Sequence, residues 1–448
     1  MRMPQPPPDL KNIWRDISHQ LETIITINTL KPIDYKGRYL HWDKLRRMPP
    51  PKGLTSEQYW WLTKMARQSI TKPLPFVDKH GANFIYAIPD PAMEMLHQID
   101  QNAAGRISMP ELIANENTRD IYLVNSLMEE AINSSQLEGA VTTNEVAKQM
   151  LRQKRKPRNR SEWMIFNNYA AMDFVREARN DPLTPDMILD LHEIVTYKTL
   201  DKPDGAGRLR YPDEKIMVVD DDGQVLHEPP MAESLSERLE SLCEFANKDK
   251  HDAFFHPVVK AILLHFVLAY DHPFVDGNGR TARALFYWYM VRRGYWLTEF
   301  ISISQIIKQG PANYGRAFLY TETDANDVTY FIVHQLKVIV RAIDQLYHYL
   351  ERKMKELESA AQLIEKTLLK DQLNHRQLNL LDHALRHPMA QYRIKEHQTT
   401  HNIVYQTARQ DLLGLESLGL LLKIKEGQSF LFLAPSDLKE RIAQHKRD

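Results

Sequence analysis

Residues 272–283 read His-Pro-Phe-Val-Asp-Gly-Asn-Gly-Arg-Thr-Ala-Arg and carry more chemical information than any other stretch of this chain. Glycine adopts positive φ angles readily and asparagine tolerates them, so Gly277-Asn278-Gly279 predicts a turn rather than the interior of a helix. Apolar residues then return with helical spacing between positions 284 and 290. The turn therefore predicts the start of a helix, whose free N–H groups and positive dipole end form a site for an anion.

The charged side chains of this stretch indicate which anion is bound. Arg280 and Arg283 are three residues apart, on one face of the predicted helix, where two guanidinium groups can hold phosphate oxygens. Asp276 would repel a phosphate, and Mg²⁺ removes this conflict because proteins hold it with one or two carboxylates plus substrate phosphates. His272 is the candidate base. The alternative is a buried histidine beside a glycine turn, with both arginines as solvated helix charges.

The stretch resembles the signature of the Fic family, His-x-Phe-x-Asp/Glu-Gly-Asn-Gly-Arg-x-x-Arg, and it matches at every specified position. The resemblance implies transfer of AMP from ATP to a Tyr, Thr or Ser hydroxyl of a target protein. It assigns His272 as general base, Asp276 as ligand of Mg²⁺ on the α- and β-phosphates, and Phe274 as an anchor of the loop. The nucleotide-binding residues that it implies in this stretch are Gly277, Asn278, Gly279, Arg280 and Arg283.

Residues 129–139, Glu-Glu-Ala-Ile-Asn-Ser-Ser-Gln-Leu-Glu-Gly, form a second motif. Ser134 and Glu138 are four residues apart on one predicted helical face, with Gly139 as the C-cap. The motif resembles the inhibitory motif of the Fic family, which implies an inhibitory helix at about 125–139 and a salt bridge from Glu138 to Arg283 in place of the γ-phosphate. It also implies AMP removal as a second activity, with Glu138 placing a water. The alternative is an ordinary helix end.

A third motif lies between these two. Residues 215–219 and 224–227 are short β-prone runs around an Asp/Gly turn, which predicts a hairpin. The hairpin is similar to the flap of the Fic family, which implies that Met217 and Val218 cover the nucleotide and that the target adds a strand. The alternative is a surface hairpin that only trims the helical core. By resemblance Tyr314 lines the nucleotide pocket, and Asp324 falls near a second pocket position.

Composition limits the classes of function. Lys+Arg and Asp+Glu number 58 each among 448 residues, so no bulk attraction to nucleic acid or to an acidic membrane is implied. The single cysteine, Cys243, excludes an internal disulfide and is expected in the core. The N-terminus shows no apolar signal segment, and the most apolar run, residues 261–270, is too short to cross a bilayer. We therefore expect a soluble, cytoplasmic protein without a membrane partner.

The periodicity predicts a mainly α fold in three parts. These are a mostly helical N-terminal region at 1–115, a Fic-type catalytic domain with the flap at 116–365, and a winged-helix domain at 366–448. The segment Lys-Pro-Leu-Pro at 72–75 is interpreted as a break, and Trp60-Trp61 as core. His192 is interpreted as structural. Asp271 is expected to point away from His272, although it could raise the pKa of that histidine.

The tail predicts a helix at 377–385, a second at 404–413 and a hairpin at 422–433, which is the order of a winged helix. Residues 407–409 resemble the recognition helix of that class. From residue 371 to the end, eleven Lys/Arg face nine Asp/Glu, so DNA binding, protein contact and dimerisation all stay open. The basic run at 152–160 is interpreted as a solvated loop. A transcription regulator or a scaffold with a vestigial Fic site is the alternative function, and the oligomeric state, a homodimer included, is left open.

Overall fold

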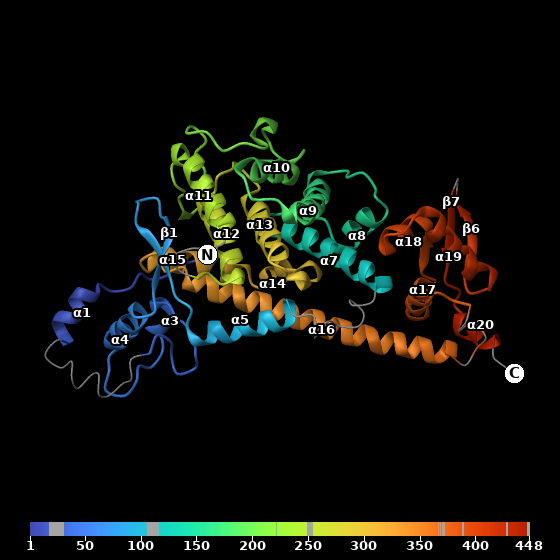
Figure 1. The fold of residues 1–448 in the computed structure, drawn as a ribbon, viewed down its shortest axis with the longest axis horizontal. Helices are drawn as coiled ribbons and strands as arrows, with labels where there is room; N and C mark the ends of the chain where they lie inside the picture. Colours follow the sequence, from blue (N-terminus) through green and yellow to red (C-terminus); the bar gives the residue numbers. More distant parts are fainter. Residues whose placement is uncertain are drawn as a thin grey trace.

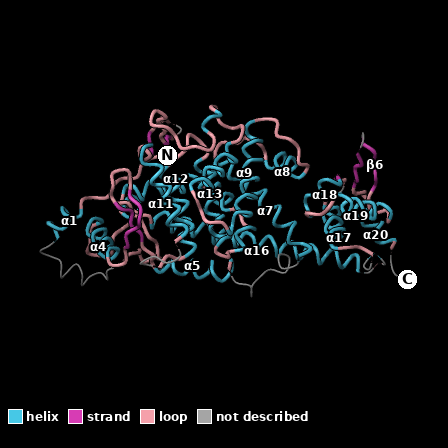
Figure 2. Tube along the Cα trace, turned by 45° about the horizontal axis from the view of Figure 1, so that its top comes forward, coloured by secondary structure: helices cyan, strands magenta, loops and turns pink. Residues whose placement is uncertain are grey.

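The computed structural model describes residues 1–17, 31–104, 116–220, 222–248, 254–365, 367, 369, 372–387, 389–426 and 429–445. The fold is mainly α, as the sequence predicts. Figure 1 shows the central helices between an N-terminal part at one end and a C-terminal domain at the other, with the long helix α16 (Thr329–Glu365) running beneath them. Figure 2 shows that strands occur in three separate places.

The centre of the molecule is the helix pair α12 (Pro257–Asp271) and α13 (Asn278–Arg292). Both helices are buried around almost their whole circumference, so neighbouring helices must cover every face. The covering helices are α7 (Glu116–Leu137), α9 (Arg160–Glu177), α10 (Pro185–Thr196), α11 (Leu235–Asn247), α15 (Pro311–Thr323) and α16, and the helices α8 (Asn144–Arg152) and α14 (Ile303–Lys308) pack on α7. Thr184 caps α10 by accepting a hydrogen bond from Met187 N, and Pro185 is the first residue of this helix.

The N-terminal part contains α1 (Leu10–Ile17), α3 (Trp42–Leu45), α4 (Ser56–Gln68) and α5 (Asp90–Ala103). Trp60 and Trp61 are buried there, and Trp61 stacks on Trp14 with ring centroids 5.4 Å apart, so their interpretation as packing residues is confirmed. The interpretation of residues 72–75 as a break is wrong, because β1 (Lys72–Val77) pairs with β2 (Asn83–Tyr86). Among the described residues β1 pairs only with β2, and an edge strand tolerates prolines that lack an N–H.

The one cysteine lies where the sequence predicts. Cys243 is on α11, is 5% exposed and belongs to the main core. Burial, with a smaller contribution from Glu240, raises the pKa of its thiol to about 12. The side chain is therefore a neutral packing group at physiological pH.

The C-terminal domain has its own apolar core. Its helices are α17 (His375–Arg386), α18 (Ile394–His401), α19 (Tyr405–Ser417) and α20 (Leu438–Gln444), and its strands are β5 (Gln391–Arg393), β6 (Leu422–Glu426) and β7 (Ser429–Leu433), in the order β5-β7-β6. The two predicted helices and the hairpin form. The sequence analysis missed β5 and α18. In the described part of the chain, no helix is both long and apolar enough to cross a membrane.

Candidate functional site

The loop between α12 and α13 is held in an unusual backbone geometry. His272 has φ +46° and Gly277 has φ +83°, and both lie in the left-handed region. A Cβ atom on Gly277 would lie 2.7 Å from Thr196 Cγ2. Glycine is therefore required at position 277 by the backbone and by the packing together.

Side chains inside the loop fix its shape. Asn278 Oδ1 accepts a hydrogen bond from Phe274 N at 3.0 Å, and Asn278 Nδ2 donates to Phe274 O at 2.8 Å. The side chain of Asn278 thus closes the loop. Asn278 is therefore expected to bind the nucleotide through its backbone N–H and not through its side chain. Phe274 is fully buried and stacks on His192 with ring centroids 3.8 Å apart, as expected of an anchor.

His192 fastens the loop from the neighbouring helix α10. Its Nδ1 accepts a hydrogen bond from Gly207 N at 3.1 Å, so its Nε2 carries the proton and donates to Asp276 O at 2.9 Å. Burial lowers the pKa of His192 to about 4, which keeps the imidazole neutral. The structural interpretation of His192 agrees with these contacts.

His272 is poised to accept a proton. Its Nδ1 lies 3.2 Å from Ala269 O, a carbonyl that can only accept, so Nδ1 carries the hydrogen and Nε2 is left with its lone pair. Burial lowers the pKa of His272 to about 4. Arg210 Nε donates to His272 O at 3.0 Å and holds the backbone. Asp271 points away, as predicted, and pairs with Arg238 at 2.7 Å.

The start of α13 has the geometry that the sequence predicts for an anion site. The hydrogen bond from Thr281 N to Gly277 O, 3.0 Å, closes the first turn, so the N–H groups of residues 278–280 precede any helical acceptor. Arg280 is fully buried, and its Nη1 donates to Val195 O at 2.9 Å. Among the described residues, Nε and Nη2 of Arg280 have no hydrogen-bond partner. Donors left unpaired at a helix N-terminus fit a phosphate group.

The second signature arginine is already engaged by the end of α7. Arg283 Nε donates to Ser134 Oγ at 2.9 Å, and Arg283 Nη2 donates to Ser134 O at 3.0 Å and to Glu138 Oε1 at 2.8 Å. Burial opposes ionisation of Glu138, but the positive charges of Arg283 and Arg280 prevail and lower its pKa. Gly139 has φ +91°, as expected of a C-cap.

Glu138 also covers the start of α13. A Cβ atom on Gly279 would lie 2.2 Å from Glu138 Oε1 and 3.0 Å from Arg283 Nη1. The carboxylate thus lies against the backbone of the signature turn. The contact brings together two segments that are about 140 residues apart in the sequence, as the resemblance implies.

Two cavities adjoin this contact. One, of about 320 Å³, is lined by Met217, His272, Asp276 and the backbone of residues 277–279. The other, of about 230 Å³, is lined mainly by apolar groups, with Val218 and Tyr314 among them. The flap forms as β3 (Val218–Val219) and β4 (Val225–His227), with Val218 opposite His227. The predicted flap and pocket residues therefore all face this site.

Tyr314 and the first residue of the chain shape the apolar cavity. Tyr314 Oη lies 2.9 Å from His265 Nε2, and burial raises the pKa of Tyr314 to about 12 although Arg283 opposes this. Met1 lines the same cavity, and its amino group bonds to Asp220 Oδ2 of the flap turn at 2.8 Å. A Cβ atom on Gly315 would lie 2.9 Å from Met1 Cε.

The second predicted pocket position is wrong. Asp324 pairs with Lys64 at 2.9 Å and accepts from Tyr330 Oη at 2.7 Å, away from both cavities. Glu322 lines the apolar cavity instead and bonds to His227 Nδ1 at 2.9 Å. Positions two apart on a helix face different ways, so a shift of two residues in the spacing changes the side chain that faces the cavity.

The basic run at 152–160 does more than face solvent. Arg155 forms a two-pronged contact with Glu162 at 2.8 and 2.9 Å. Arg160 pairs with Asp201 at 2.8 Å, and its Nη2 lies 3.6 Å from Asp276 Oδ2. The run is largely exposed, as predicted for a solvated loop, and the prediction is corrected only at Arg155, which is held by Glu162 seven residues further on.

Asp276 is suited to a metal that binds mainly to phosphates. Its side chain is 41% exposed, and its Oδ1 accepts a hydrogen bond from Gly277 N at 2.5 Å. Within the described ranges, no group of three or more His, Cys, Asp or Glu side chains can hold a metal ion. A single carboxylate beside a phosphate site matches Mg²⁺, which keeps its waters and uses few protein ligands.

Known proteins are similar to this chain over its central part. The sequence model described as the Fic/DOC family matches residues 182–290. Protein adenylyltransferase Fic of Nematostella vectensis is 33% identical over 117 residues, 26% of this chain and 25% of that protein. The protein of the same name from Drosophila melanogaster is 41% identical over 69 residues, 15% of this chain and 14% of that protein. The chain thus spans a quarter or less of the length of these curated relatives.

Two solved structures are similar at low identity. A Fic family protein from Desulfovibrio desulfuricans aligns with 78% of this chain and 97% of its own, at 16% identity and a TM-score of 0.49. A signalling protein with a Fic domain from Bacteroides thetaiotaomicron covers 58% and 96%, at 22% identity and a TM-score of 0.46. Residues 182–290, which contain the complete signature, match the sequence pattern of the Fic/DOC family.

Proposed function

We propose that the protein transfers AMP from ATP to a hydroxyl group of a protein, and that Glu138 restrains this activity. One observation carries the proposal. A neutral histidine with a free Nε2, His272, lies in the same cavity as the uncapped N-terminus of α13. A general base next to an anion site is what an attack by a hydroxyl on a phosphate requires.

The chemical step is a displacement at the α-phosphate. His272 Nε2 takes the proton from a Tyr, Thr or Ser hydroxyl, whose oxygen forms a bond to the α-phosphorus. The bond from this phosphorus to the pyrophosphate oxygen breaks, and AMP stays on the target as a phosphodiester. The N–H groups of residues 278–280 and the unpaired nitrogens of Arg280 stabilise the charge on the phosphates.

Magnesium fits this arrangement, with Asp276 as its protein ligand. The bound ion would neutralise charge on the α- and β-phosphates and favour departure of pyrophosphate. Arg160, 3.6 Å from the same carboxylate, would turn from Asp276 when the ion binds. The flap residues Met217 and Val218 would cover the nucleotide, with Tyr314 in the apolar cavity beside it.

The restraint follows from competition for Arg283. A γ-phosphate needs the guanidinium that Glu138 and Ser134 hold, so ATP binds in the resting protein without this contact. The same carboxylate can position a water next to the modified phosphate, so removal of AMP is the second activity that we propose for this site. Both activities belong in the cytoplasm, where ATP is abundant.

The C-terminal domain supports a second candidate function, recognition of a partner. The order of its helices and its three-stranded sheet is that of a winged helix, with α19 in the place of the recognition helix. We favour protein contact over DNA, because α18 packs on α7 and on α8 of the catalytic part. A regulator with a vestigial site is disfavoured by a complete set of site residues.

Incubation with ATP and Mg²⁺ followed by mass spectrometry tests the proposal. The protein, or a lysate protein that it modifies, should gain the mass of one AMP. His272→Ala should keep its fold and its ATP binding while transfer falls by about 10²-fold or more. Transfer at the wild-type rate in this variant would remove His272 from the role of base.

A further inference from the structure

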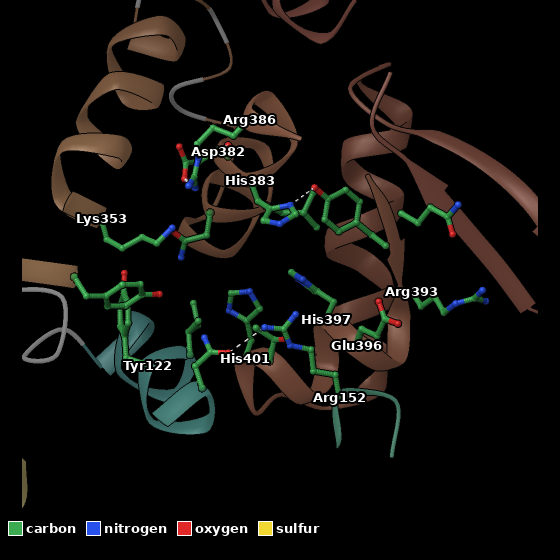
Figure 3. A pocket seen from close by; sticks show the side chains of 18 residues that line it. Tyr122, Arg152, Lys353, Asp382, His383, Arg386, Arg393, Glu396, His397 and His401 are labelled. Atoms are coloured by element: carbon green, nitrogen blue, oxygen red, sulfur yellow. Dashed lines mark hydrogen bonds and ion pairs between the residues drawn. The ribbon is translucent and has the colours of Figure 1, made fainter. Parts of the chain in front are cut away.

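The junction between the central helices and the C-terminal domain encloses another cavity, of about 350 Å³ (Figure 3). One wall is formed by α7, the end of α8 and α16, and the other by α17, β5 and α18. The cavity shares no residue with the two cavities at the signature loop. Its volume is in the range of sites that take small molecules.

Positive charge predominates in the walls. Four cationic side chains and two carboxylates line the cavity, namely Arg152, Lys353, Arg386 and Arg393, and Asp382 and Glu396. Both carboxylates are engaged within the walls, because Asp382 pairs with Arg386 and Glu396 Oε1 accepts from Gln153 Nε2 at 2.7 Å. The excess of positive charge favours an anion.

Two covered polar atoms in the walls lack a partner. Arg152 Nη2 donates to Asn125 Oδ1 at 3.2 Å, but Arg152 Nε has no hydrogen-bond partner in the part of the chain that the structure describes. His401 is only 7% exposed, and its Nδ1 is likewise unpaired. Both residues line the cavity, and a ligand that supplies oxygen atoms would give these two nitrogens the partners that buried polar groups normally have.

Two histidines of the cavity, His383 and His401, are neutral. Burial, with the neighbouring His397, lowers the pKa of His401 to about 3. Burial, with the neighbouring His387, lowers the pKa of His383 to about 4. Figure 3 shows the side chains of Lys353, His383 and Arg152 reaching the same space from three sides. A neutral imidazole donates one hydrogen bond and leaves the arginines to match the charge of the anion.

We propose that this cavity binds a small organic anion, either a phosphate monoester or a carboxylate, with a ring or short apolar part, and that its binding strengthens the restraint by Glu138. The walls supply both components. Guanidinium groups match the oxygens of either anion, and Tyr122, Tyr349 and Tyr392 offer apolar surface for the remainder of the ligand.

Helix α7 connects the cavity to the signature loop. Tyr122 and Asn125 line the cavity, and the same helix ends at the residues that hold Arg283, roughly 20 Å further on at 1.5 Å per residue. The C-terminal domain touches α7 directly, through α18 and through Asn402 Nδ2, 3.4 Å from Asp120 Oδ2. The two walls and the Glu138–Arg283 pair exist in one arrangement, so a ligand that bridges the walls stabilises that arrangement.

Calorimetric titration of the full chain tests the binding site. The probes are inorganic phosphate, phenyl phosphate and benzoate. Comparing the two phosphates shows what the ring contributes to binding, and comparing phenyl phosphate with benzoate shows which anion the cavity prefers. Arg152→Gln should weaken binding of the preferred probe about tenfold or more. The matched control is Arg158→Gln, because Arg158 is an exposed residue of the same basic run. Any phosphate that binds at the start of α13 binds equally to both variants, so a difference between them reports the cavity alone. Equal binding by the two variants would overturn the proposal.

A second variant keeps the test independent of folding defects. His401→Leu removes the unpaired nitrogen, so its melting temperature without a probe should not fall below that of the wild-type protein. The rise of melting temperature caused by the probe should be lost. A rise as large as in the wild-type protein would exclude His401 from the site and refute the assignment.

The regulatory part rests on the proposed function and has its own readout. The preferred probe should lower AMP labelling by wild-type protein about fivefold or more, in the range of ordinary coupling between sites. Glu138→Gly should bind the probe more weakly, by no more than the same factor because coupling between sites is reciprocal, and should label at the same rate with and without it. Inhibition that persists in Glu138→Gly would refute coupling through the helix. Failure of both proteins to label would refute the proposed function, and the titrations alone would then decide the binding site.

Discussion

In the function that we propose, a single carboxylate, that of Glu138, determines the resting state of the site. It occupies Arg283 at 2.8 Å and lies against the backbone of Gly279. Glu138→Gly removes this competitor and frees the arginine for a phosphate. We expect AMP transfer, measured as self-labelling with ATP, to rise by about an order of magnitude or more, since the loss of 1.4 kcal/mol of competition is already tenfold.

Two controls define this effect. Arg283→Ala should not activate, because it removes the γ-phosphate ligand together with the lock. Glu129→Gly places a glycine inside α7, nine residues before Glu138, at a carboxylate that pairs with Lys148 instead. Equal activation by Glu129→Gly would show that loosening α7, and not the ion pair, controls transfer.

The depressed pKa of His272 predicts how transfer depends on pH. Burial lowers this pKa to about 4, so the imidazole is a free base at all pH values well above 4 and is protonated only as the pH falls through that value. The pKa of Glu138 is also lowered, so in the wild-type protein the ion pair between Glu138 and Arg283 stays intact over the same pH range. We expect the rate of Glu138→Gly to show no histidine step between about pH 6 and 8. A half-maximal rate near pH 6.5 would contradict the buried position of the base.

The signature residues could be predicted from the sequence, whereas their supports could not. The positions His272 to Arg283 lie within one short stretch, so spacing alone brings them together. His192, Arg210 and Val195 reach the loop from positions at least 60 residues away. Such contacts depend on how the helices pack, and no local pattern encodes them.

At the scale of elements, the junction of α12 and α13 depends on one glycine. In Gly277→Ala, the alanine must adopt a left-handed backbone conformation, which costs about 1–2 kcal/mol. Its Cβ would also lie 2.7 Å from Thr196 Cγ2. We expect the free energy of unfolding in urea to fall by more than this amount and transfer to be lost. Gly294→Ala has nearly the same φ, +84°, with nothing within 4 Å of its Cβ. Gly294→Ala should therefore lose stability but keep AMP transfer. If Gly294→Ala also loses transfer, the loss in Gly277→Ala is explained by general instability and not by the shape of the loop.

Elements with strong periodicity or clear caps were predictable, and the rest were not. The helices α10 and α17 carry such signals. Strand β1 contains two prolines, which its position at a sheet edge allows. Helix α18 reads Ile-Lys-Glu-His-Gln-Thr-Thr-His and buries few apolar residues of its own, so its place follows from packing on its neighbours.

At the scale of the whole molecule, two of the cationic residues that DNA binding would use are engaged elsewhere. The candidates are Arg393, Lys395, Arg409, Lys423 and Lys425. Arg393 lines the cavity between the central helices and the C-terminal domain, and Lys423 pairs with Glu416 at 3.1 Å. We expect the full chain to bind a DNA duplex only in the non-specific range, with a dissociation constant of about 10⁻⁶ M or weaker at physiological salt. Tight, salt-sensitive binding to one defined duplex would support the DNA interpretation instead.

The extent of the main core was not evident from the sequence. Leu74, Phe76, Phe84 and Tyr86 of the N-terminal hairpin belong to the same core as α12 and α13. Their apolar side chains alternate with exposed residues in a short strand, a pattern that shows burial but not the partner. The three-part division of the chain at 115 and 366 remains a prediction.

The buried state of Cys243 makes this chain convenient for spectroscopic probes. A covered thiol with a pKa of about 12 reacts slowly with maleimides and methanethiosulfonates at neutral pH, so native cysteine needs no replacement. Cysteines introduced at exposed positions such as Val146 on α8 and Lys395 near the start of α18 would therefore carry the labels. Distances between paired spin labels at these sites would then report directly whether the C-terminal domain approaches or leaves the catalytic helices when nucleotide is added.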